Sequence, residues 1–316
     1  MKNYIIGIDI GGSYIKSGIV KYDGEIVASM KIPTPMSVGV GSMENVFKTI
    51  AARLTEQAGI TKENIIGVGV GSAGAVDSSL GEVCFAANLT MERFPLASVA
   101  EEALGLPVKV ANDANCACLG EWKFGSGKNF SDMILVTLGT GVGGGIIVDN
   151  KLLTGNRGAG GEIGHMLLCK GGRQCSCGRK GCFEAYVSGG ALVSQTIEAM
   201  QKDRKTKLWK IMDESKMITP KLIFDMSRED KLAKKIVGDY IVNLAEGLVD
   251  LGNIFRPQAI IIGGGLSAQG DYLIAPVREY VNGHLFAKDT TPQVEILQAK
   301  LGNSAGVIGA ASLFVN

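Results

Sequence analysis

A cluster of metal-binding side chains in the middle of the chain constrains the fold more than any other feature. His165, Cys175, Cys177 and Cys182 lie close together in a sequence that holds two His and seven Cys in all. Zinc prefers thiolate and imidazole ligands, and three Cys with one His is a standard set for a closed structural site. Glycines beside and between these cysteines let the backbone fold tightly around an ion. We therefore expect a structural zinc ion that fixes this loop.

A disulfide or a group of unrelated buried thiols is the alternative. Cys175 and Cys177 are too close in sequence to pair easily, and nothing in the chain indicates an oxidising compartment. The remaining cysteines are most simply reduced, small hydrophobic side chains; they are Cys84, Cys116, Cys118 and Cys169.

Length and composition indicate two packed domains. The chain has 316 residues, of which 46% are hydrophobic, and a typical domain has ~100–200 residues. The formal charge is +1, from 32 basic and 31 acidic residues, which argues against nucleic acid as a partner. The apolar run of residues 5–10 is too short for a signal peptide or a membrane span. We expect a cytoplasmic protein that binds neither nucleic acid nor a membrane.

Apolar periodicity predicts a mixed sheet covered by helices in the first part of the chain. Three strands that open the chain form a meander, since a tight Asp-Gly turn joins the second to the third. The expected strands are 4–9, 15–20, 25–32, 65–70 and 108–111, and the expected helices are 43–58, 96–104 and 114–124.

The same order of elements begins again near residue 133. A strand at 133–138, a glycine-rich turn at 139–145 and a strand at 146–148 repeat the pattern of residues 4–20. This repetition indicates two related halves with a cleft between them. The expected later elements are a helix at 230–255, a strand at 259–262 and a helix at 304–313, with residues 201–216 as an irregular surface connection.

Three glycine-rich turns follow apolar strands, at residues 9–13, 139–145 and 263–267. Backbone amides in such turns can approach phosphate oxygens because no side chain blocks them. None carries the Lys of a Walker A loop or a G-x-G-x-x-G between strand and helix. One such turn alone is most simply an ordinary tight turn, but three in order, the first with an Asp, indicate a nucleotide site.

These turns resemble the first phosphate, second phosphate and adenosine motifs of the sugar kinase, heat-shock and actin superfamily. The stretch 112–115 with 119–121, followed by the His/Cys run, narrows the resemblance to the ROK family of repressors and sugar kinases. It covers essentially the whole chain. Two departures are visible: Ser13 stands where the family usually has Thr, and Ala73 where many glucokinases have Pro.

The resemblance implies an α/β fold with two actin-like (ribonuclease H-like) domains and a cleft between them. Each would be a mixed five-stranded sheet flanked by helices, with a zinc-bound loop in the second. We expect the N-terminal domain at 1–112 and the C-terminal domain at 113–302, with a final helix at 303–316 packed back on the first. The resemblance to this family also implies a homodimer or homotetramer.

The resemblance further implies an ATP-dependent hexose kinase that phosphorylates a sugar hydroxyl, with the 6-hydroxyl of glucose expected. A kinase for N-acylmannosamine or another hexose or hexosamine is the alternative. Asp113 would be the catalytic base, His165, Cys175, Cys177 and Cys182 the zinc ligands, and Asp9 the partner of Mg²⁺. Sugar hydroxyls would be held by Gly74, Asn88, Asn112, Asp113, Glu162, His165 and Glu184. ATP would contact Asp9, Gly11, Gly12, Ser13, Lys16, Gly139, Thr140, Gly141, Gly143, Gly264 and Gly265. Lys16 could reach a phosphate, but alternation along a strand could equally leave its side chain in solvent.

Each acidic candidate also has an ordinary structural interpretation. Asn112 or Asp113 would be a good helix N-cap, and Asp9 could stabilise a turn. Glu162 and Glu184 could be solvated surface acids. Phosphoryl transfer needs an oriented hydroxyl, an acceptor for its proton, and amides with Mg²⁺ on the phosphates, which favours the functional interpretation.

A sugar-responsive transcriptional repressor is the second hypothesis. Such repressors resemble this chain with an added N-terminal helix-turn-helix module. The first phosphate motif begins at Asp9 and the charge is near neutral, so we expect a kinase rather than a repressor.

Overall fold

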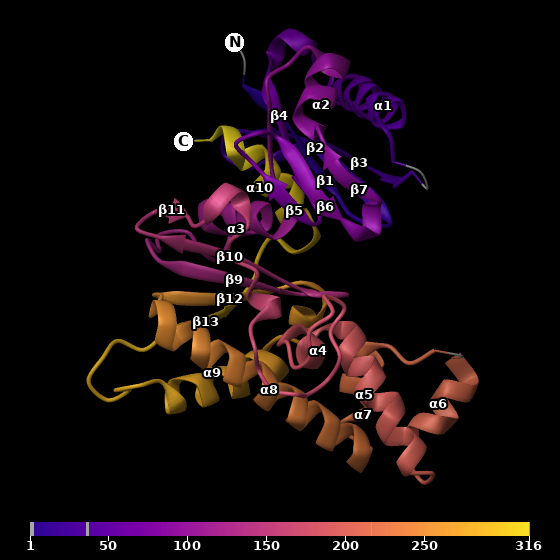
Figure 1. The fold of residues 1–316 in the computed structure, drawn as a ribbon, viewed down its shortest axis with the longest axis vertical. Helices are drawn as coiled ribbons and strands as arrows, with labels where there is room; N and C mark the ends of the chain where they lie inside the picture. The colour runs from indigo at the N-terminus through magenta and orange to yellow at the C-terminus, as the bar shows by residue number, and fades with distance from the viewer. Residues whose placement is uncertain (1–2, 36–37, 216, 316) are drawn as a thin grey trace. The chain divides into compact units, whose positions relative to one another are not determined.

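The computed structural model describes residues 3–35, 38–215 and 217–315 (Figure 1). The chain divides into two compact units. The first takes Met1–Ser131, Gly145–Gly161 and Lys300–Asn316, and the second takes Asp132–Gly144 and Glu162–Ala299. This division differs from the expected boundary between residues 112 and 113, because the helix that begins at Asp113 belongs to the first unit.

The first unit is built on a mixed sheet with the strand order β3-β2-β1-β4-β8. The first three strands form the predicted antiparallel meander, and β4 and β8 add in parallel to β1. The strands are β1 (Tyr4–Ile10), β2 (Tyr14–Lys21), β3 (Ile26–Pro33), β4 (Ile65–Ser72) and β8 (Val108–Asn112). The helices are α1 (Val40–Ala58), α2 (Leu96–Leu104), α3 (Asp113–Phe124) and α10 (Ala305–Ala311).

Alternation along β1 places different side chains on the two faces of this sheet. Ile6, Ile8 and Ile10 are fully buried in the core that α1 and α2 cover. On the opposite face, Gly7 lies against α10: a Cβ there would be 2.1 Å from the carbonyl oxygen of Val307. The absence of a side chain at Gly7 therefore lets α10 pack directly on the sheet, within the first unit (Figure 1).

A small antiparallel sheet, β5-β6-β7, also belongs to the first unit. It comprises β5 (Ala75–Asp77), β6 (Glu82–Ala86) and β7 (Met91–Phe94). It begins directly after Gly74, so it continues the chain from the end of β4.

The second large sheet has the order β11-β10-β9-β12-β13. Its strands are β9 (Met133–Leu138), β10 (Val142–Val148), β11 (Lys151–Leu152), β12 (Ala259–Gly263) and β13 (Glu295–Gln298). In chain order both large sheets read third, second, first, fourth, fifth, and β12 is parallel to β9 as β4 is to β1. The predicted mixed α/β fold with an internal repeat is confirmed.

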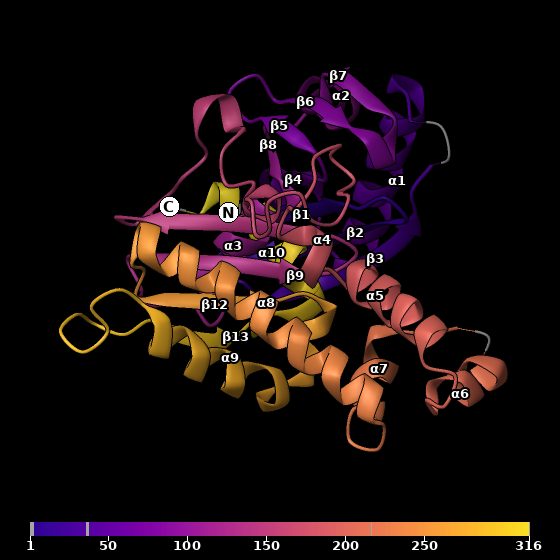
Figure 2. The same ribbon diagram turned by 60° about the horizontal axis from the view of Figure 1, so that its bottom comes forward.

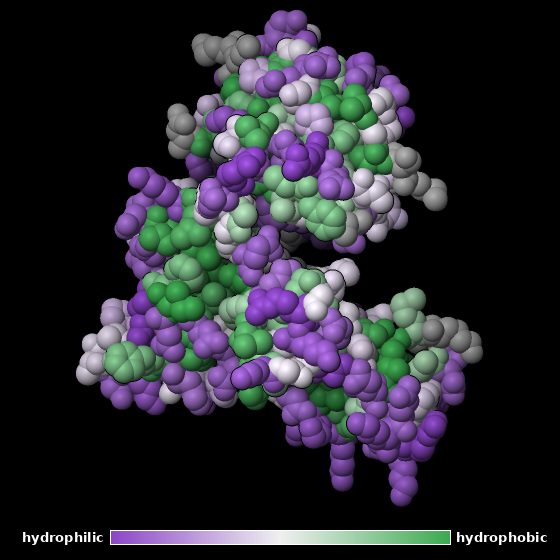
Figure 3. Space-filling model, viewed as in Figure 1, coloured by the Kyte–Doolittle hydropathy of each residue, from purple (hydrophilic) through white to green (hydrophobic). Residues whose placement is uncertain are grey.

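Helices make up most of the rest of the second unit. They are α4 (Glu184–Val187), α5 (Gly189–Lys202), α6 (Leu208–Ser215), α7 (Pro220–Met226), α8 (Lys231–Phe255) and α9 (Asp271–His284). The long helix α8 was predicted, and it lies beside α9 (Figure 2). Hydrophilic residues cover much of the visible face where α5, α7 and α8 lie (Figure 3). In the part of the chain that is described, no helix is both long and apolar enough to cross a membrane.

Two predictions about secondary structure are wrong. Most of residues 201–216 is not irregular, since α5 continues to Lys202 and α6 begins at Leu208; Lys216 lies outside the described residues. The Asp230 carboxylate accepts hydrogen bonds from the Thr206 hydroxyl and the Lys207 amide, both at 2.9 Å. A residue far along the chain therefore holds the segment just before α6 in place. The predicted turn at 139–145 is also too long, because β10 begins at Val142.

Candidate functional site

Two acidic side chains of the first unit lie at the carboxyl ends of two parallel strands, β1 and β8, with β4 between them. Asp9 is next to last in β1, and Asp113 directly follows β8. The register pairs Ile10 with Ser72 of β4 and Ser72 with Asn112 of β8, which places these ends at one edge of the sheet. Burial, together with the negative charge of Asp113, raises the pKa of Asp9 to about 6, against the opposing effect of Lys16.

Asn112, not Asp113, is the N-cap of α3. Its side-chain oxygen accepts bonds from the amides of Ala114 and Asn115 at 2.9 and 3.1 Å. Its side-chain amide donates to the Gly74 carbonyl at 3.0 Å, which ties the predicted sugar-facing turn to the helix. Asp113 occupies the first helical position, where burial raises its pKa. Asp113 Oδ1 also accepts the Ala114 amide at 2.9 Å, but the N-cap position itself belongs to Asn112.

The first glycine-rich turn joins β1 to β2. The Gly11 amide donates to the Tyr14 carbonyl at 3.1 Å, and the Thr34 hydroxyl donates to the Gly11 carbonyl at 2.7 Å. Gly12 and Ser13 are exposed. A Cβ on Gly12 would lie 3.4 Å from the Cβ of Asn88, which places that predicted sugar residue beside the turn.

Gly306 is a residue of this site that the sequence patterns did not reveal. A Cβ on Gly306 would lie 2.6 Å from the Oδ2 atom of Asp9. Only glycine leaves room for the Asp9 carboxylate beside α10. The run of small residues in the last helix was the available signal, but it indicates close packing without naming a partner.

The second unit brings the other two glycine-rich turns together. They follow β9 and β12, which are parallel neighbours, so their carboxyl ends share an edge. A Cβ on Gly264 would lie 2.4 Å from the carbonyl oxygen of Leu138, and Gly264 has a φ of 79°. The Gly189 amide, at the start of α5, donates to the Gly139 carbonyl at 2.8 Å. Gly143 lies inside β10 rather than in a turn, unlike the prediction.

We expect Gly264→Ala to destabilise the second unit by at least ~2 kcal/mol, because it adds a steric clash to a left-handed backbone. The midpoint of thermal unfolding should fall by roughly 4–8 °C. Gly265→Ala is the matched control, since a Cβ on Gly265 meets nothing within 4 Å and its φ is not positive. Equal unfolding midpoints for the two variants would contradict this prediction.

Glu184 connects the second glycine-rich turn to the cysteine loop. Its Oε2 atom accepts the Val142 amide at 2.9 Å, and its Oε1 atom accepts the Ser176 hydroxyl at 3.0 Å. A Cβ on Gly141 would lie 2.5 Å from Oε2. Glu184 is therefore not a solvated surface acid: it is fixed by protein contacts on both oxygens.

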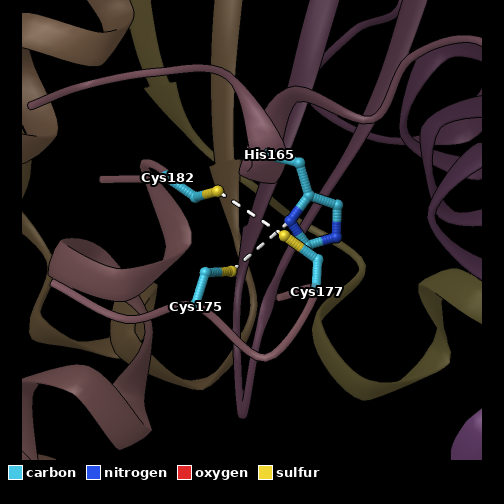
Figure 4. A group of neighbouring side chains, drawn as sticks. All are labelled: His165, Cys175, Cys177 and Cys182. Carbon is cyan, nitrogen blue, oxygen red and sulfur yellow. Dashed lines mark hydrogen bonds between the residues drawn. The ribbon is translucent and has the colours of Figure 1, made fainter. Parts of the chain in front are cut away.

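The four predicted metal ligands converge on one point (Figure 4). Their ligand atoms all lie within 4.8 Å of one another. The sulfurs of Cys177 and Cys182 are 3.6 Å apart, and Cys175 Sγ is 3.7 Å from His165 Nδ1. Zn–S bonds of ~2.3 Å in a tetrahedron place two sulfurs ~3.8 Å apart, so these residues fit a zinc ion.

The backbone around the cluster holds the ligands in place. The Cys175 amide donates to the Arg179 carbonyl at 2.9 Å, and the Arg179 guanidinium donates to the His165 carbonyl at 3.2 Å. The predicted glycine role is observed at Gly178 and Gly181, whose φ values are 89° and 86°. All seven cysteines are free of disulfides, so the disulfide alternative is not realised.

Glu162 opens the 3-10 helix that carries the His ligand. It is exposed and directly precedes Ile163–His165, and the His165 amide donates to the Glu162 carbonyl at 3.0 Å. The predicted residues thus fall into two groups. The first unit holds Asp9, Gly11, Gly12, Ser13, Lys16, Gly74, Asn88, Asn112 and Asp113, and the second holds Gly139, Thr140, Gly141, Gly143, Glu162, His165, Glu184, Gly264, Gly265 and the cysteine ligands.

Known proteins resemble the chain over nearly its full length. A glucokinase of Streptomyces coelicolor is 39% identical over 315 residues, which cover 98% of this chain and 96% of that protein. A xylose repressor of Caldicellulosiruptor bescii is 32% identical over 99% of this chain and 78% of its own length. The crystal structure of a ROK family glucokinase from Streptomyces griseus, in complex with glucose and AMPPNP, matches with a TM-score of 0.84 and 36% identity over 98% of each chain. The model of the ROK family matches residues 5–316, and the chain belongs to this family.

Proposed function

We propose that this protein is an ATP-dependent hexose kinase that transfers the γ-phosphate to the 6-hydroxyl of glucose. The observation that carries the proposal is the half-buried Asp113 carboxylate at the first position of α3, close enough to Asp9 to raise the pKa of that carboxyl, while Asn112 is the N-cap. The similarity of the chain to glucokinases and its membership of the ROK family support this reaction. A kinase for another hexose or a hexosamine is the alternative within the same reaction class.

Asp113 acts as the base in this proposal. It accepts the proton of the sugar hydroxyl as the hydroxyl oxygen bonds to the γ-phosphorus and the bond to the β-phosphate oxygen breaks, with ADP as the leaving group. Hydroxyl groups of a sugar are donors, which carboxylate and carbonyl acceptors match. The proposed sugar contacts are Gly74, Asn88, Asn112, Asp113, Glu162, His165 and Glu184.

The three glycine-rich turns bind ATP through their backbone amides in this proposal. Gly11, Gly12, Gly139 and Gly265 have no side chain of their own to block the approach of phosphate oxygens to their amides. Asp9 would hold Mg²⁺, directly or through water, and Mg²⁺ neutralises charge on the phosphates. Asp9 has an oxygen donor suited to this ion.

We also propose that His165, Cys175, Cys177 and Cys182 bind one structural zinc ion. Four protein ligands leave no open position, so this ion would hold the loop between Glu162 and Glu184 without activating water. Free thiols and the use of ATP fit a cytoplasmic location. A homodimer or homotetramer stays a prediction; the exposed side chains of Ile254 and Phe286 in the second unit are consistent with a further interface.

A sugar-responsive regulator is the second candidate, favoured by the relationship to a xylose repressor. A regulator needs sugar binding but no turnover. Asp113 and the nucleotide turns are present together, which favours the kinase.

Release of ADP in the presence of a panel of hexoses tests both candidates. We expect ATP-dependent turnover with glucose that exceeds turnover with mannose and N-acetylmannosamine. A different preferred hexose would replace glucose but keep the reaction. Sugar binding by calorimetry without ADP release for any hexose would favour the regulator.

A further inference from the structure

Asp77, at the end of β5, is a fully buried carboxylate outside the predicted site. Its Oδ1 atom accepts bonds from the Ser79 amide at 3.0 Å, the Ser79 hydroxyl at 2.6 Å and the Leu80 amide at 3.3 Å. Its Oδ2 atom accepts the Arg157 Nε–H at 2.6 Å. These bonds, the Ser79 hydroxyl first, lower the pKa of Asp77 to about 2. Asp77 is therefore ionised at neutral pH and bonded through both oxygens.

The partner of Asp77 comes from a loop far along the chain. Arg157 lies in the 3-10 helix Asn156–Gly158 with a φ of 54°, a conformation that costs a non-glycine residue free energy. Gly158 packs against β5: a Cβ added at Gly158 would lie 2.1 Å from the Val76 carbonyl oxygen. Two independent contacts, one ionic and one steric, thus hold this loop against β5.

The ion pair of Asp77 with Arg157 and the contact of Gly158 with Val76, together called the anchor, connect two segments that the proposed function uses. β5 directly follows Gly74, whose carbonyl accepts the Asn112 amide. The loop continues from Gly158 through Gly161, which has a φ of 84°, directly into Glu162. Both anchored segments therefore lead within a few residues to a proposed sugar contact, at Gly74 on one side and Glu162 on the other.

We infer that Asp77 and Arg157 are positioning residues for the hexose. The inference rests on the proposed function and deepens it: the ion pair fixes the chain before Glu162 to the strand after Gly74. Neither side chain touches the sugar in this arrangement. An exposed ion pair contributes little to stability, but removal of the partner of a buried carboxylate costs more because the charge is left uncompensated. The Arg157 side chain is 63% exposed while that of Asp77 is fully buried, so the arginine can be replaced with little loss of packing.

Three variants test the inference: Arg157→Gly, Arg157→Lys and Asp77→Asn. Arg157→Gly removes the ion pair and also relieves the positive φ. We expect Arg157→Gly and Asp77→Asn to raise the KM for glucose ~10-fold through misplacement of the sugar contacts. The KM for ATP should stay within about twofold, since the nucleotide turns are separate. Arg157→Lys keeps a cation within reach of Asp77 and should recover most of the loss.

Hydrogen exchange supplies a readout that does not depend on activity. The amides of Ala159 and Gly160 donate to the Asn156 and Thr154 carbonyls at 3.1 and 2.8 Å, and they should exchange faster in Arg157→Gly. Lys21→Ala is the control, since it breaks an exposed ion pair of the same length, between Lys21 and Glu25, elsewhere in the first unit. It should change neither quantity.

The outcomes separate the two levels of the argument. Faster exchange with an unchanged KM for glucose would overturn the positioning role while the kinase stands. Unchanged exchange in Arg157→Gly would overturn the anchor itself. A wild-type protein without hexose kinase activity would refute the proposed function and with it the positioning role, while exchange would still decide whether the anchor exists. If Asp77→Asn fails to fold, the two exposed Arg157 variants carry the same test.

Discussion

Asp113→Asn is expected to lower kcat by ~10²–10⁴-fold, the usual cost of losing a general base. The amide keeps the shape of the side chain and one hydrogen-bonding oxygen, so the affinity for sugar should fall far less than turnover. Part of the loss would come from positioning, because the transition state of phosphoryl transfer is loose. The structure sharpens this test. Asn112 is the N-cap of α3, and the side-chain oxygen of Asn at position 113 can still accept the Ala114 amide that Asp113 accepts at 2.9 Å, so a loss of turnover cannot be ascribed to a lost cap.

The pH profile gives the prediction a second readout. A base must be unprotonated to act, and burial raises the pKa of Asp113. The rate of the wild-type enzyme should therefore fall, as pH decreases, at a higher pH than an ordinary aspartate would give. That dependence should be lost in Asp113→Asn.

Asp230→Asn is the matched control for Asp113→Asn. Asp230 caps α8 through the Ala233 amide at 2.9 Å and lies outside the proposed site. Asn caps a helix about as well as Asp, and the bond from the Lys207 amide that the variant loses lies outside the proposed site, so this variant should keep its turnover. Near-normal turnover of Asp113→Asn at saturating sugar and ATP would refute the catalytic role.

Local patterns were sufficient to predict the five-stranded sheet of the first unit, three strands of the second large sheet and the helices α1, α2, α3, α8 and α10, but not the small sheet, β11, β13 or the other helices. The predicted bounds of α2 and β9 agree with the structure, and the start of the long helix α8 differs by one residue. These elements combine apolar periodicity with a clear end signal, such as Gly105 after α2, so neighbours in sequence determine them. The repeat of strand, glycine-rich turn and strand also predicted two related halves, and the two large sheets share one strand order.

Elements fixed by distant contacts were not predictable in the same way. The glycines of β10 look like a turn in the sequence, yet they lie in the strand. At Gly145 a Cβ would lie 2.2 Å from the Cβ of Cys118, so close packing rather than a turn requires glycine there. The short helix α6 depends on Asp230, which lies beyond another helix in the chain. A pattern read along the sequence contains neither contact.

In the candidate site, too, local patterns were predictable from the sequence and contacts between distant residues were not. The ligand set of the cysteine loop lies within one short stretch, and the four side chains converge as the spacing predicted. The assignment of the cap to Asn112 and the contact of Gly306 with Asp9 required the three-dimensional arrangement. Asp77 and Arg157 gave no signal, because a single acid and a single base far apart in sequence carry no pattern.

Cys177→Ala is expected to abolish zinc binding, from about one ion per chain to a trace. Structural zinc binds with an apparent ~10–16 kcal/mol in zinc-finger peptides, and this free energy is coupled to local folding. A loss of only ~3 kcal/mol in the second unit would lower the midpoint of thermal unfolding by roughly 6–12 °C. Metal analysis by mass spectrometry and thermal unfolding of the same preparation measure the two effects together.

Cys169→Ala separates the role of the cluster from that of any thiol in the loop. Cys169 is exposed, lies between His165 and Cys175 in sequence, and is not one of the clustered ligands, so its replacement should leave zinc content unchanged. Because Ser176 and Glu184 are bonded at the edge of the cluster, loss of zinc in Cys177→Ala should also weaken sugar binding, whereas a purely peripheral ion would leave it intact. If Cys177→Ala does not fold, removal of zinc from the wild-type protein by a chelator provides the same comparison. Wild-type protein that contains no zinc, yet unfolds at the same temperature and turns over at the same rate after zinc is added, would show that the thiols fold without a metal.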